Sequence, residues 1–223
     1  STNLLPTPEL PVVVGSLGLV GRPWATINDS GEVAFIATSG EQRGYWHRSV
    51  NGPLEYLAQG GRRVPGRPTA TMIGASFTTE PQMTNGSAGA VFRVQVADET
   101  LGGDRRRALL SGRPGAVSVV AGFSSQAPGT ESGTVFTNFG EPAAAPGQGV
   151  AFSGALVGPN TGTLNGGIWR LGSSGVELVA RRGAQAPGQA AGVLFGESTA
   201  IASGGGTGGT LFRSVLQGSG VTE

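Results

Sequence analysis

Hydrophobic residues occur along the chain in short runs, and Gly, Pro, Asn or Ser interrupts each run before several helical turns are complete. Short apolar runs bounded by turn residues are typical of antiparallel strands that follow one another in a meander. The pattern therefore predicts an all-β fold. The same succession of strands is predicted twice, at 33–38, 45–49, 54–58 and 69–77 and again at 150–157, 167–171, 176–180 and 192–197.

Two tight turns are predicted with a specific backbone conformation. Asn51-Gly52 lies between two apolar runs, and this dipeptide favours a type I′ hairpin, in which both central residues have positive φ. The segment 28–31, Asn-Asp-Ser-Gly, predicts a second turn with Gly31 in the left-handed region. Each turn would join two adjacent antiparallel strands.

Two motifs recur along the chain. The first reads Gly-x-Val-Ala-Phe or a close variant, and its anchors, at nearly equal intervals, are Phe35, Phe92, Phe152 and Phe212. The second is an aliphatic pair, a Gly-rich turn and then Pro-Gly, with its prolines at Pro65, Pro128 and Pro187 and a weaker copy at 13–21. Recurrence at this regular spacing indicates tandem structural units anchored by these Phe and Pro residues.

The motifs divide a single repeat domain, 1–223, into about four units. Their approximate bounds are 27–82, 83–142, 143–200, and 201–223 completed by 1–26. Four antiparallel strands per unit fit the four-stranded blade of a β-propeller or of an open relative of one. A sheet of this size cannot bury both of its faces alone, so the units are expected to stack.

The fourth unit is split between the two ends of the chain. The stretch after Phe212 and the stretch from Ser1 to Gly21, taken together, match the length from Phe35 to Gly66 in the first unit. An incomplete unit leaves an open strand edge. Residues 4–26 would either pair with residues 210–217 of the same chain and close a ring, or pair with the next chain and build a head-to-tail fibre.

Composition narrows the classes of function. Only 13% of residues are charged and the net charge is +1, so we expect no nucleic-acid partner and no attraction to anionic membranes. The absence of Cys excludes disulfides and thiolate metal sites. No apolar stretch is long enough for a membrane-spanning helix. We expect no cofactor.

The groups that could carry chemistry are few. His47 is the only histidine, and a zinc site or a Ser-His-Asp triad would need partners for it that no recognisable motif supplies. We interpret His47 as a strand-surface residue and the Arg clusters at 62–63, 105–107 and 181–182 as solvated loops. We therefore predict no catalytic residue, no metal site and no enzymatic activity.

Trp46 and Trp169 occupy equivalent places in their units. Aromatic residues at equivalent places in a repeat usually pack in the core. The alternative is that both rings are exposed and stack on sugar rings, so they are also the candidate ligand-stacking residues. Burial of both rings would count strongly against that alternative.

Residues 28–35, Asn-Asp-Ser-Gly-Glu-Val-Ala-Phe, match every position of the pattern Asn-x-x-Gly-x-x-Ala-Phe. In this the chain resembles the bacterial NxxGxxAF tandem-repeat family. Looser copies of the pattern, together with the Gly-x-Trp and Ala-Pro-Gly segments, extend the resemblance over nearly the whole chain. The resemblance implies a β-propeller-like repeat fold and secretion, to the outside of the cell or its surface. It implies no catalytic residues, because the motifs are structural.

These observations favour a non-catalytic extracellular scaffold protein that self-assembles into filaments by exchange of terminal strands between subunits. The expected partners are further copies of the chain, head to tail, or a cell-surface or glycan ligand. The alternative function is a lectin-like, ligand-binding propeller that is monomeric as a closed ring. A hydrolase on the same scaffold would need a cleft lined by two or more carboxylates near His47.

Overall fold

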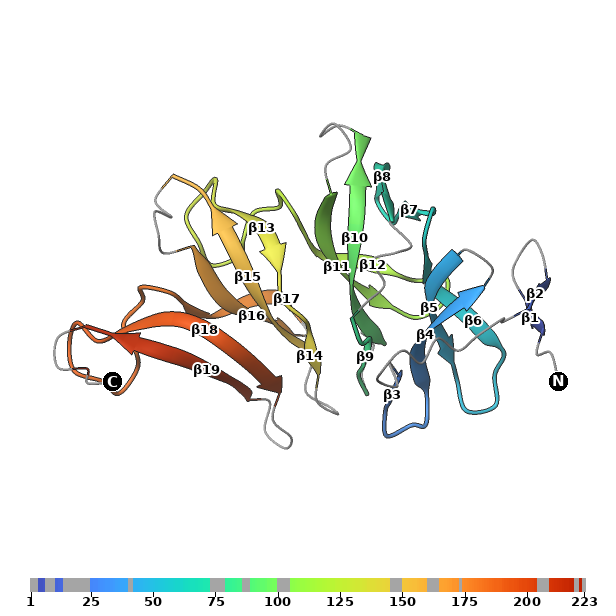
Figure 1. The fold of residues 1–223 in the computed structure, drawn as a ribbon. Helices are drawn as coiled ribbons and strands as arrows, with labels where there is room; N and C mark the ends of the chain where they lie inside the picture. Colours follow the sequence, from blue (N-terminus) through green and yellow to red (C-terminus); the bar gives the residue numbers. More distant parts are fainter. Residues whose placement is uncertain are drawn as a thin grey trace.

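The computed structural model describes residues 4–6, 11–13, 25–39, 42–72, 79–85, 89–99, 105–144, 150–159, 165–172, 174–203, 209–218 and 221. These residues form antiparallel β-sheets and no helix, so the predicted all-β class is confirmed. No helix that could cross a membrane occurs among them. Figure 1 shows the sheets following one another along an elongated molecule.

Three multi-stranded sheets make up the middle of the molecule. The first has the order β3 (Ala25–Ile27), β4 (Val33–Ser39), β5 (Gln42–Arg48), β6 (Leu54–Gln59). The second contains β7 (Arg63–Val64), β8 (Arg67–Met72), β9 (Gln82–Met83), β10 (Ala90–Asp98), β11 (Arg105–Gly112) and β12 (Ser118–Gly122). The third contains β13 (Val135–Phe139), β14 (Ala143–Ala144), β15 (Val150–Val157), β16 (Gly166–Gly172) and β17 (Gly175–Arg181).

Each of these sheets is the same meander. A first strand precedes the strand with the anchor Phe, and a third and a fourth strand follow it. The first strand is broken in two in the second and third sheets, as β8 with β9 and β13 with β14. The unit bounds expected from the sequence, at 27, 83 and 143, fall at or near the ends of these first strands, so each sheet takes its first strand from the preceding sequence unit.

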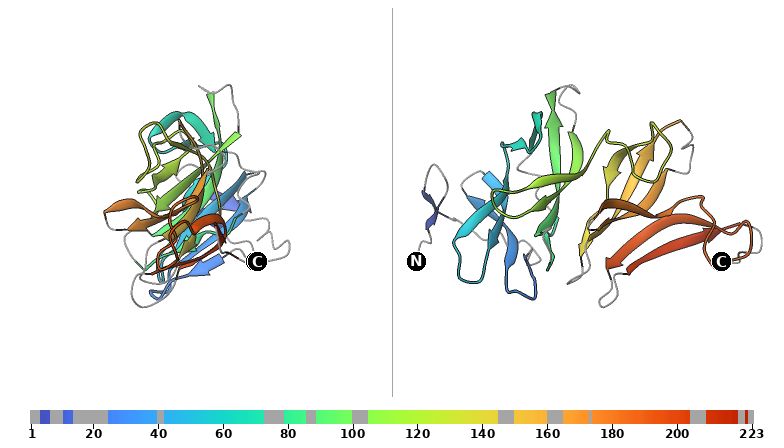
Figure 2. Two further views of the ribbon diagram at one scale, coloured as in Figure 1. Left: turned by 90° about the vertical axis from the view of Figure 1, so that its left-hand side faces the viewer. Right: turned by 180° about the vertical axis from the view of Figure 1, so that it is seen from behind.

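The two ends of the chain form separate two-stranded sheets. β18 (Leu194–Ser203) pairs with β19 (Thr210–Gln217), and β1 (Leu4–Pro6) pairs with β2 (Pro11–Val13). Figures 1 and 2 show the two hairpins at opposite ends of the molecule. Within the described residues β19 pairs with β18 and not with β1 or β2, so these strands do not confirm ring closure, one of the two arrangements expected from the sequence. Residues 7–10 and 14–24 of the expected closing segment lie outside the described part.

The sheets are stacked, and the second is buried on both faces. Neighbouring residues of a strand point to opposite faces. Leu110 of β11 therefore belongs to the core shared with the first sheet, whereas Leu109 belongs to the core shared with the third. In the first of these cores the rings of Tyr45 and Phe92 are 4.7 Å apart. The stacking expected for the repeat units is thus present in the middle of the molecule.

A β-bulge interrupts the pairing of the third and fourth strands at the same place in each sheet. The shifts lie between Tyr45 and Trp46, between Leu109 and Leu110, and between Ile168 and Trp169. The residues skipped on the fourth strands are Leu57, Val120 and Val179. A bulge bends its strand and increases the local twist. The aliphatic pair in the second sequence motif therefore marks a recurring bend.

The Pro-Gly motif forms the turn that leads from one sheet into the next. The amide of Thr130 donates to the Ala127 carbonyl across Pro128 and Gly129, and Gly129 has φ of 75°. Proline at the first central position and a left-handed glycine at the second are what a type II turn requires. Gly66 and Gly188, after Pro65 and Pro187, have φ of 71° and 74°.

A glutamine closes each of the last two loops. The Gln126 side chain donates to the Glu131 carbonyl at 3.0 Å and accepts the Gly133 amide at 2.9 Å. Gln185 makes the same bonds, to the Ala190 carbonyl and from the Gly192 amide, both at 2.9 Å. The two loops differ at the three positions after Pro-Gly and still share one hydrogen-bonding scheme.

Replacing the turn glycines with alanine should destabilise the two loops to different degrees. Gly188→Ala meets no atom within 4 Å, so only the left-handed backbone costs stability, about 1–2 kcal/mol. Gly129→Ala carries the same strain, and its Cβ would also lie 2.7 Å from the Leu178 Cβ. We expect a larger loss in denaturant unfolding for Gly129→Ala, and equal losses would contradict this account.

The Asn51-Gly52 turn differs from the sequence prediction. The Gly52 amide donates to the Ser49 carbonyl at 3.1 Å, and neither Asn51 nor Gly52 has a positive φ. The type I′ prediction is therefore wrong, because the connection between β5 and β6 is longer than the two-residue loop of that turn. The left-handed conformation predicted for Gly31 is confirmed, with φ of 75°.

Candidate functional site

Four of the six aromatic residues that the sequence singled out are fully buried. Phe92 and Phe152 are fully buried, whereas Phe35 and Phe212 are partly buried. Trp46 is 1% exposed and Trp169 is 0% exposed. A ring without an exposed face cannot stack on a sugar, so the structure gives both Trp residues a packing role. The candidate ligand-stacking surface is absent at these two positions.

The two Trp residues differ in one contact. Trp169 Nε1 donates to the Pro128 carbonyl at 3.0 Å, and this bond joins β16 to the preceding inter-sheet turn. Trp46 Nε1 is buried and has no acceptor among the described residues. The indole of Trp46 instead packs against Tyr56, with ring centroids 3.9 Å apart. Only Trp169 therefore ties its sheet to a turn through a polar bond.

A buried polar cluster surrounds the Asn-x-x-Gly turn of the first sheet. Asn28 Oδ1 accepts the amides of Ser30 at 3.1 Å and Glu32 at 2.9 Å. Asn28 Nδ2 donates to Glu32 Oε2 at 2.8 Å and to the Thr84 carbonyl at 2.9 Å. Asn28, the first residue of the Asn-x-x-Gly motif, therefore stabilises its own turn and links it to the second sheet through the Thr84 carbonyl.

Glu32 carries the charge of this cluster. Its Oε1 is paired with the guanidinium of Arg113, which follows β11, and His47 Nε2 lies 3.7 Å from the same oxygen. Hydrogen bonding from Arg113 lowers the pKa of Glu32 in spite of its burial. Burial lowers the pKa of His47 more than the neighbouring carboxylate raises it. The stable state near neutral pH is therefore an ionised Glu32 beside a neutral His47.

His47 is buried, at 3% exposure, and not on a strand surface as predicted. The β5 position that carries it faces the Glu32 cluster, which begins in the turn before β4. Neither ring nitrogen has a hydrogen-bond partner in the described part of the chain. The described residues bring no three His, Asp or Glu side chains together as metal ligands. The cluster joins the first and second sheets.

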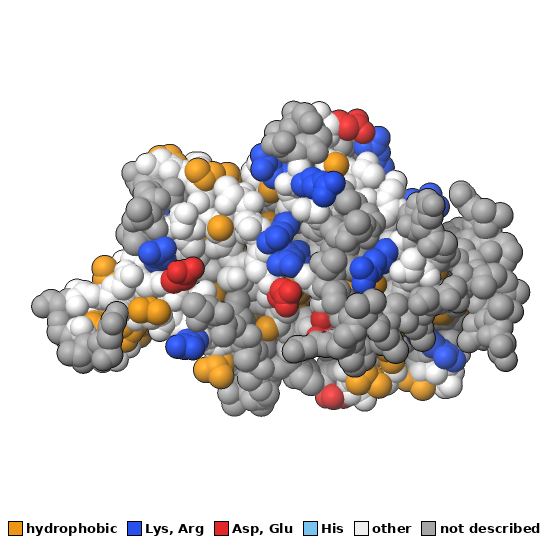
Figure 3. Space-filling model, in the orientation of Figure 1, with side chains coloured by type: hydrophobic (Ala, Val, Ile, Leu, Met, Phe, Trp, Pro, Cys, Tyr) orange, Lys and Arg blue, Asp and Glu red, His pale blue; other side chains and the backbone are white. Residues whose placement is uncertain are grey.

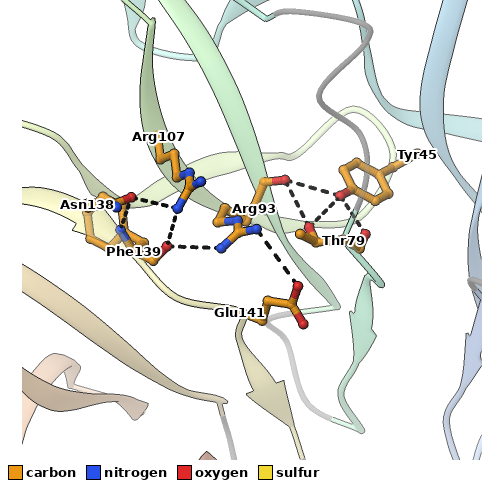
Figure 4. A network of polar contacts seen from close by, with 7 residues as sticks. All are labelled: Tyr45, Thr79, Arg93, Arg107, Asn138, Phe139 and Glu141. Carbon is orange, nitrogen blue, oxygen red and sulfur yellow. Dashed lines mark hydrogen bonds and ion pairs between the residues drawn. The ribbon is translucent and has the colours of Figure 1, made fainter. Parts of the chain in front are cut away.

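A second polar network joins the second and third sheets (Figure 4). Arg93 of β10 and Arg107 of β11 both donate to the Phe139 carbonyl, at 3.1 and 3.5 Å. Arg107 also donates to Asn138 Oδ1 at 2.9 Å, and Glu141 lies 3.9 Å from Arg93. Burial, followed by the positive charge of Arg107, lowers the pKa of Arg93. Two guanidinium groups therefore converge on one carbonyl.

The network continues toward the first sheet. The Tyr45 hydroxyl donates to the Thr79 carbonyl at 2.8 Å and lies 3.1 Å from the Arg93 carbonyl. Burial raises the pKa of Tyr45, so this hydroxyl remains a proton donor. Tyr45 of the first sheet therefore joins the polar network of Arg93, which extends to the third sheet, so one network connects all three sheets (Figure 4).

A cavity of about 280 Å³ opens beside the Arg107 end of this network. It lies between the second sheet, the third sheet and β18. Its lining combines glycines with polar side chains, namely Gly140, Gly154, Gly166 and Gly167 with Arg107, Asn138, Ser153, Asn165, Glu197 and Ser198. The volume is close to the lower end of small-molecule sites. Glycines leave backbone atoms open to a ligand.

The β18–β19 hairpin presents an exposed apolar face. Leu211 is 66% exposed and Val215 is 52% exposed. Leu211 immediately precedes the anchor Phe212, and the residues at this place in the other sheets, Ala34, Val91 and Ala151, are buried. In the first sheet, Ile27 of β3 is also 66% exposed. Figure 3 shows basic side chains over the middle of one face and apolar side chains toward the end of the molecule that carries β18 and β19.

The sequence interpretation missed three features of the structure, one strand and two contacts. Arg105–Arg107 were expected in a solvated loop, but they begin β11. The Glu32–Arg113 pair joins two residues that are far apart in the chain, and no local pattern signals it. Asn85 binds the Asp29 amide at 2.9 Å. Its signal was available, because Asn85 stands seven residues before Phe92, as Asn28 stands before Phe35.

Comparison with protein-family models matches residues 27–223 to one described as "Family of unknown function (DUF7453)". No curated protein and no solved structure shows significant similarity to the chain. The match begins at the end of β3 and spans every later strand. The family match thus covers the repeat architecture and brings no named activity with it.

Proposed function

The chain belongs to the DUF7453 family, whose function is unknown, and on the geometry of its two ends we propose that it is a non-catalytic extracellular scaffold protein that assembles head to tail into filaments. In this assembly the β1–β2 hairpin of one copy completes the sheet that β18 and β19 begin in another copy. The secretion implied by the NxxGxxAF resemblance supports the extracellular location.

The complementary hairpins are the observation that carries this proposal. β18 and β19 are equivalent to the first and second strands of a sheet, because Phe212 lies on β19 as Phe152 lies on β15. β2 leads into the weak copy of the second motif at 13–21, whose other copies begin on the fourth strands. Together the hairpins supply four strands, one complete propeller-like unit.

Open edges and exposed apolar side chains give the assembly its driving force. The outer edge of β19 is unpaired within the described residues, and such an edge is a template for strand addition. A following sheet would also cover Leu211 and Val215, as Ala34 is covered by the second sheet. A contact between two different surfaces does not close on itself unless the rotation permits a ring, so it yields filaments.

Assembly is tested by sedimentation velocity and electron microscopy of the chain over a range of concentrations. We expect filaments whose mean length grows with concentration. Val215→Glu should abolish them, because it places a charge on the surface to be covered. Val157→Glu is the matched control, since Val157 and Val215 are both 52% exposed but Val157 lies in the third sheet. Monomers at every concentration, or equal loss in both variants, would overturn the proposal.

A mixing experiment tests the polarity of the contact. Leu5→Pro removes a backbone donor from β1, so this variant should accept a hairpin but fail to donate one. Val215→Glu should donate but fail to accept. Each variant alone is expected to remain monomeric, whereas an equimolar mixture should form discrete heterodimers. A mixture that stays monomeric contradicts hairpin exchange.

The lectin-like alternative lacks its expected surface in this structure. It relied on Trp46 and Trp169 as exposed stacking residues, and both rings are buried. It also relied on a closed ring, whereas the described strands at the two ends lie apart. The assembly proposal therefore has the stronger structural support.

A further inference from the structure

Arg107 and Gly166 hold the same place in two successive sheets. Arg107 lies three residues before Leu110, and Gly166 lies three residues before Trp169. Leu110 and Trp169 are each paired with the anchor Phe of the neighbouring strand. The third strand of the second sheet therefore carries a guanidinium where the third strand of the third sheet carries no side chain.

Asn138 and Glu197 are related in the same way. Asn138 lies two residues after Phe136, and Glu197 lies two residues after Phe195. Both Phe residues follow the position that is bridged to the loop glutamine. Each first strand has a register shift here. The first strand of each sheet thus presents an acceptor at this place, as an amide in one case and a carboxylate in the other.

The acceptor is used differently in two successive contacts, the one between the second and third sheets and the one between the third sheet and β18. Between the second and third sheets, Arg107 donates to Asn138 and to the Phe139 carbonyl. Glu197 of β18 and Gly166 of the third sheet both line the cavity. In the part of the chain that the structure describes, Glu197 makes no hydrogen bond or ion pair. The contact between the third sheet and β18 therefore lacks the guanidinium that the contact between the second and third sheets contains.

We propose that the cavity lined by the second sheet, the third sheet and β18 binds the guanidinium group of an arginine side chain supplied by another chain. The bound group takes the place that Arg107 occupies one sheet earlier, with Glu197 as its main acceptor. The Ser198 carbonyl is equivalent to that of Phe139 and is the second acceptor. Ser153 and Asn165 also line the cavity and are further polar residues for the bound group.

The chemistry of the lining favours arginine over other ligands. A carboxylate accepts two parallel N–H groups from a planar guanidinium, and this charge-assisted pair is stronger than the amide contact of Arg107. Lysine has no planar fork and would gain less. An anion would face Glu197 at close range. Arg107, which also lines the cavity, already has acceptors in Asn138 and Phe139.

Calorimetric titration with a blocked arginine-containing peptide tests the site. The same peptide with citrulline in place of arginine is the control ligand, because citrulline keeps the shape and loses the charge. We expect the arginine peptide to bind at least about tenfold more tightly than the citrulline peptide. Equal binding of the two peptides overturns the proposal, and so does binding by inorganic phosphate that displaces the arginine peptide.

Three variants locate the contact. Glu197→Gln should weaken arginine-peptide binding about tenfold or more. Glu141→Gln is the matched control, an exposed carboxylate beside the Arg93 network that does not line the cavity. Gly166→Arg should abolish binding by filling the cavity. A Cβ at Gly166 meets only the Gly154 carbonyl, at 3.5 Å, so this variant should fold, which circular dichroism checks. Unchanged affinity in Glu197→Gln contradicts the assignment.

The source of the arginine is resolved in the same samples. If a second copy supplies it, the blocked peptide should shorten the filaments measured by sedimentation, and Glu197→Gln should do so without the peptide. If a different protein supplies it, the peptide should bind while filament length stays constant. The cavity assignment stands or falls on peptide binding alone, so loss of filaments does not decide it.

Discussion

Replacing Trp169 with alanine is expected to lower the free energy of unfolding by about 3–5 kcal/mol. The side chain is fully buried, and its ring lies 4.8 Å from Phe136 and 6.3 Å from Phe152. Truncation leaves a cavity between the second and third sheets and removes the bond to the Pro128 carbonyl. Denaturant unfolding followed by far-ultraviolet circular dichroism measures the loss.

A pair of Trp-to-Phe variants separates the hydrogen bond from the packing. Trp169→Phe leaves the partly buried Pro128 carbonyl without its donor, which costs about 1 kcal/mol, the lower end of the range for an unsatisfied buried acceptor. Trp46→Phe removes an indole N–H that has no acceptor in the described structure, so only the packing difference remains. We expect Trp169→Phe to be the more destabilising of the two. Equal losses would show that the inter-sheet bond contributes nothing measurable.

Replacing Arg113 with methionine is the second large perturbation. It leaves Glu32 buried beside Asn28 and His47 without a cation. Breaking a buried pair by removing one partner costs about 3–5 kcal/mol. Arg113 itself is partly exposed, so we expect about 2–3 kcal/mol, in line with this partial solvent screening. Methionine keeps the apolar length of the side chain, which makes the variant a test of charge.

The same pair makes stability depend on pH. The folded pKa of Glu32 is depressed, so its contribution is complete above the unfolded pKa and is lost as pH falls through the folded pKa. The folded pKa of His47 is also depressed, here by burial. Its protonation therefore favours the unfolded chain as pH falls below about 6.5. Both groups make the protein less stable in acid.

Unfolding curves recorded between neutral pH and pH 4 measure this dependence. The unaltered chain should lose stability throughout the interval. In Arg113→Met the main cause of the lowered Glu32 pKa is gone, so the curve should flatten at its acid end while starting from a lower value. A constant difference between the two chains at every pH would mean that Arg113 stabilises by packing alone.

Local sequence patterns predicted the strands well because each strand is bounded by residues that end it. The predicted strand 150–157 is observed at those bounds, and Gly31 is left-handed because the Asn28 turn requires it. The anchor Phe residues recur because one strand of every unit must face its neighbour. These features depend on residues close together in the chain, so the sequence contains their full cause.

Contacts between units were not predictable in this way. His47 was expected at a strand surface, but Glu32 and Arg113 enclose it from two sheets. Arg107 lies in a basic run that is typical of a loop, yet strand pairing with β10 places it against Asn138. That Gly166 lacks the side chain that Arg107 supplies in the second sheet is evident only when the registers of the two sheets are compared. Such features depend on stacking geometry, which strand patterns do not encode.

The turns that join the sheets allow each sheet to pack only on the sheets before and after it. Stability in such an array is a sum of nearest-neighbour terms, so the terminal hairpins, with one neighbour each, should fray first. Amide hydrogen exchange in β1, β2 and β19 is then expected to be the fastest among the strands of an isolated molecule. A growing filament would turn these frayed ends into interior positions, and unfolding temperature should rise with chain concentration.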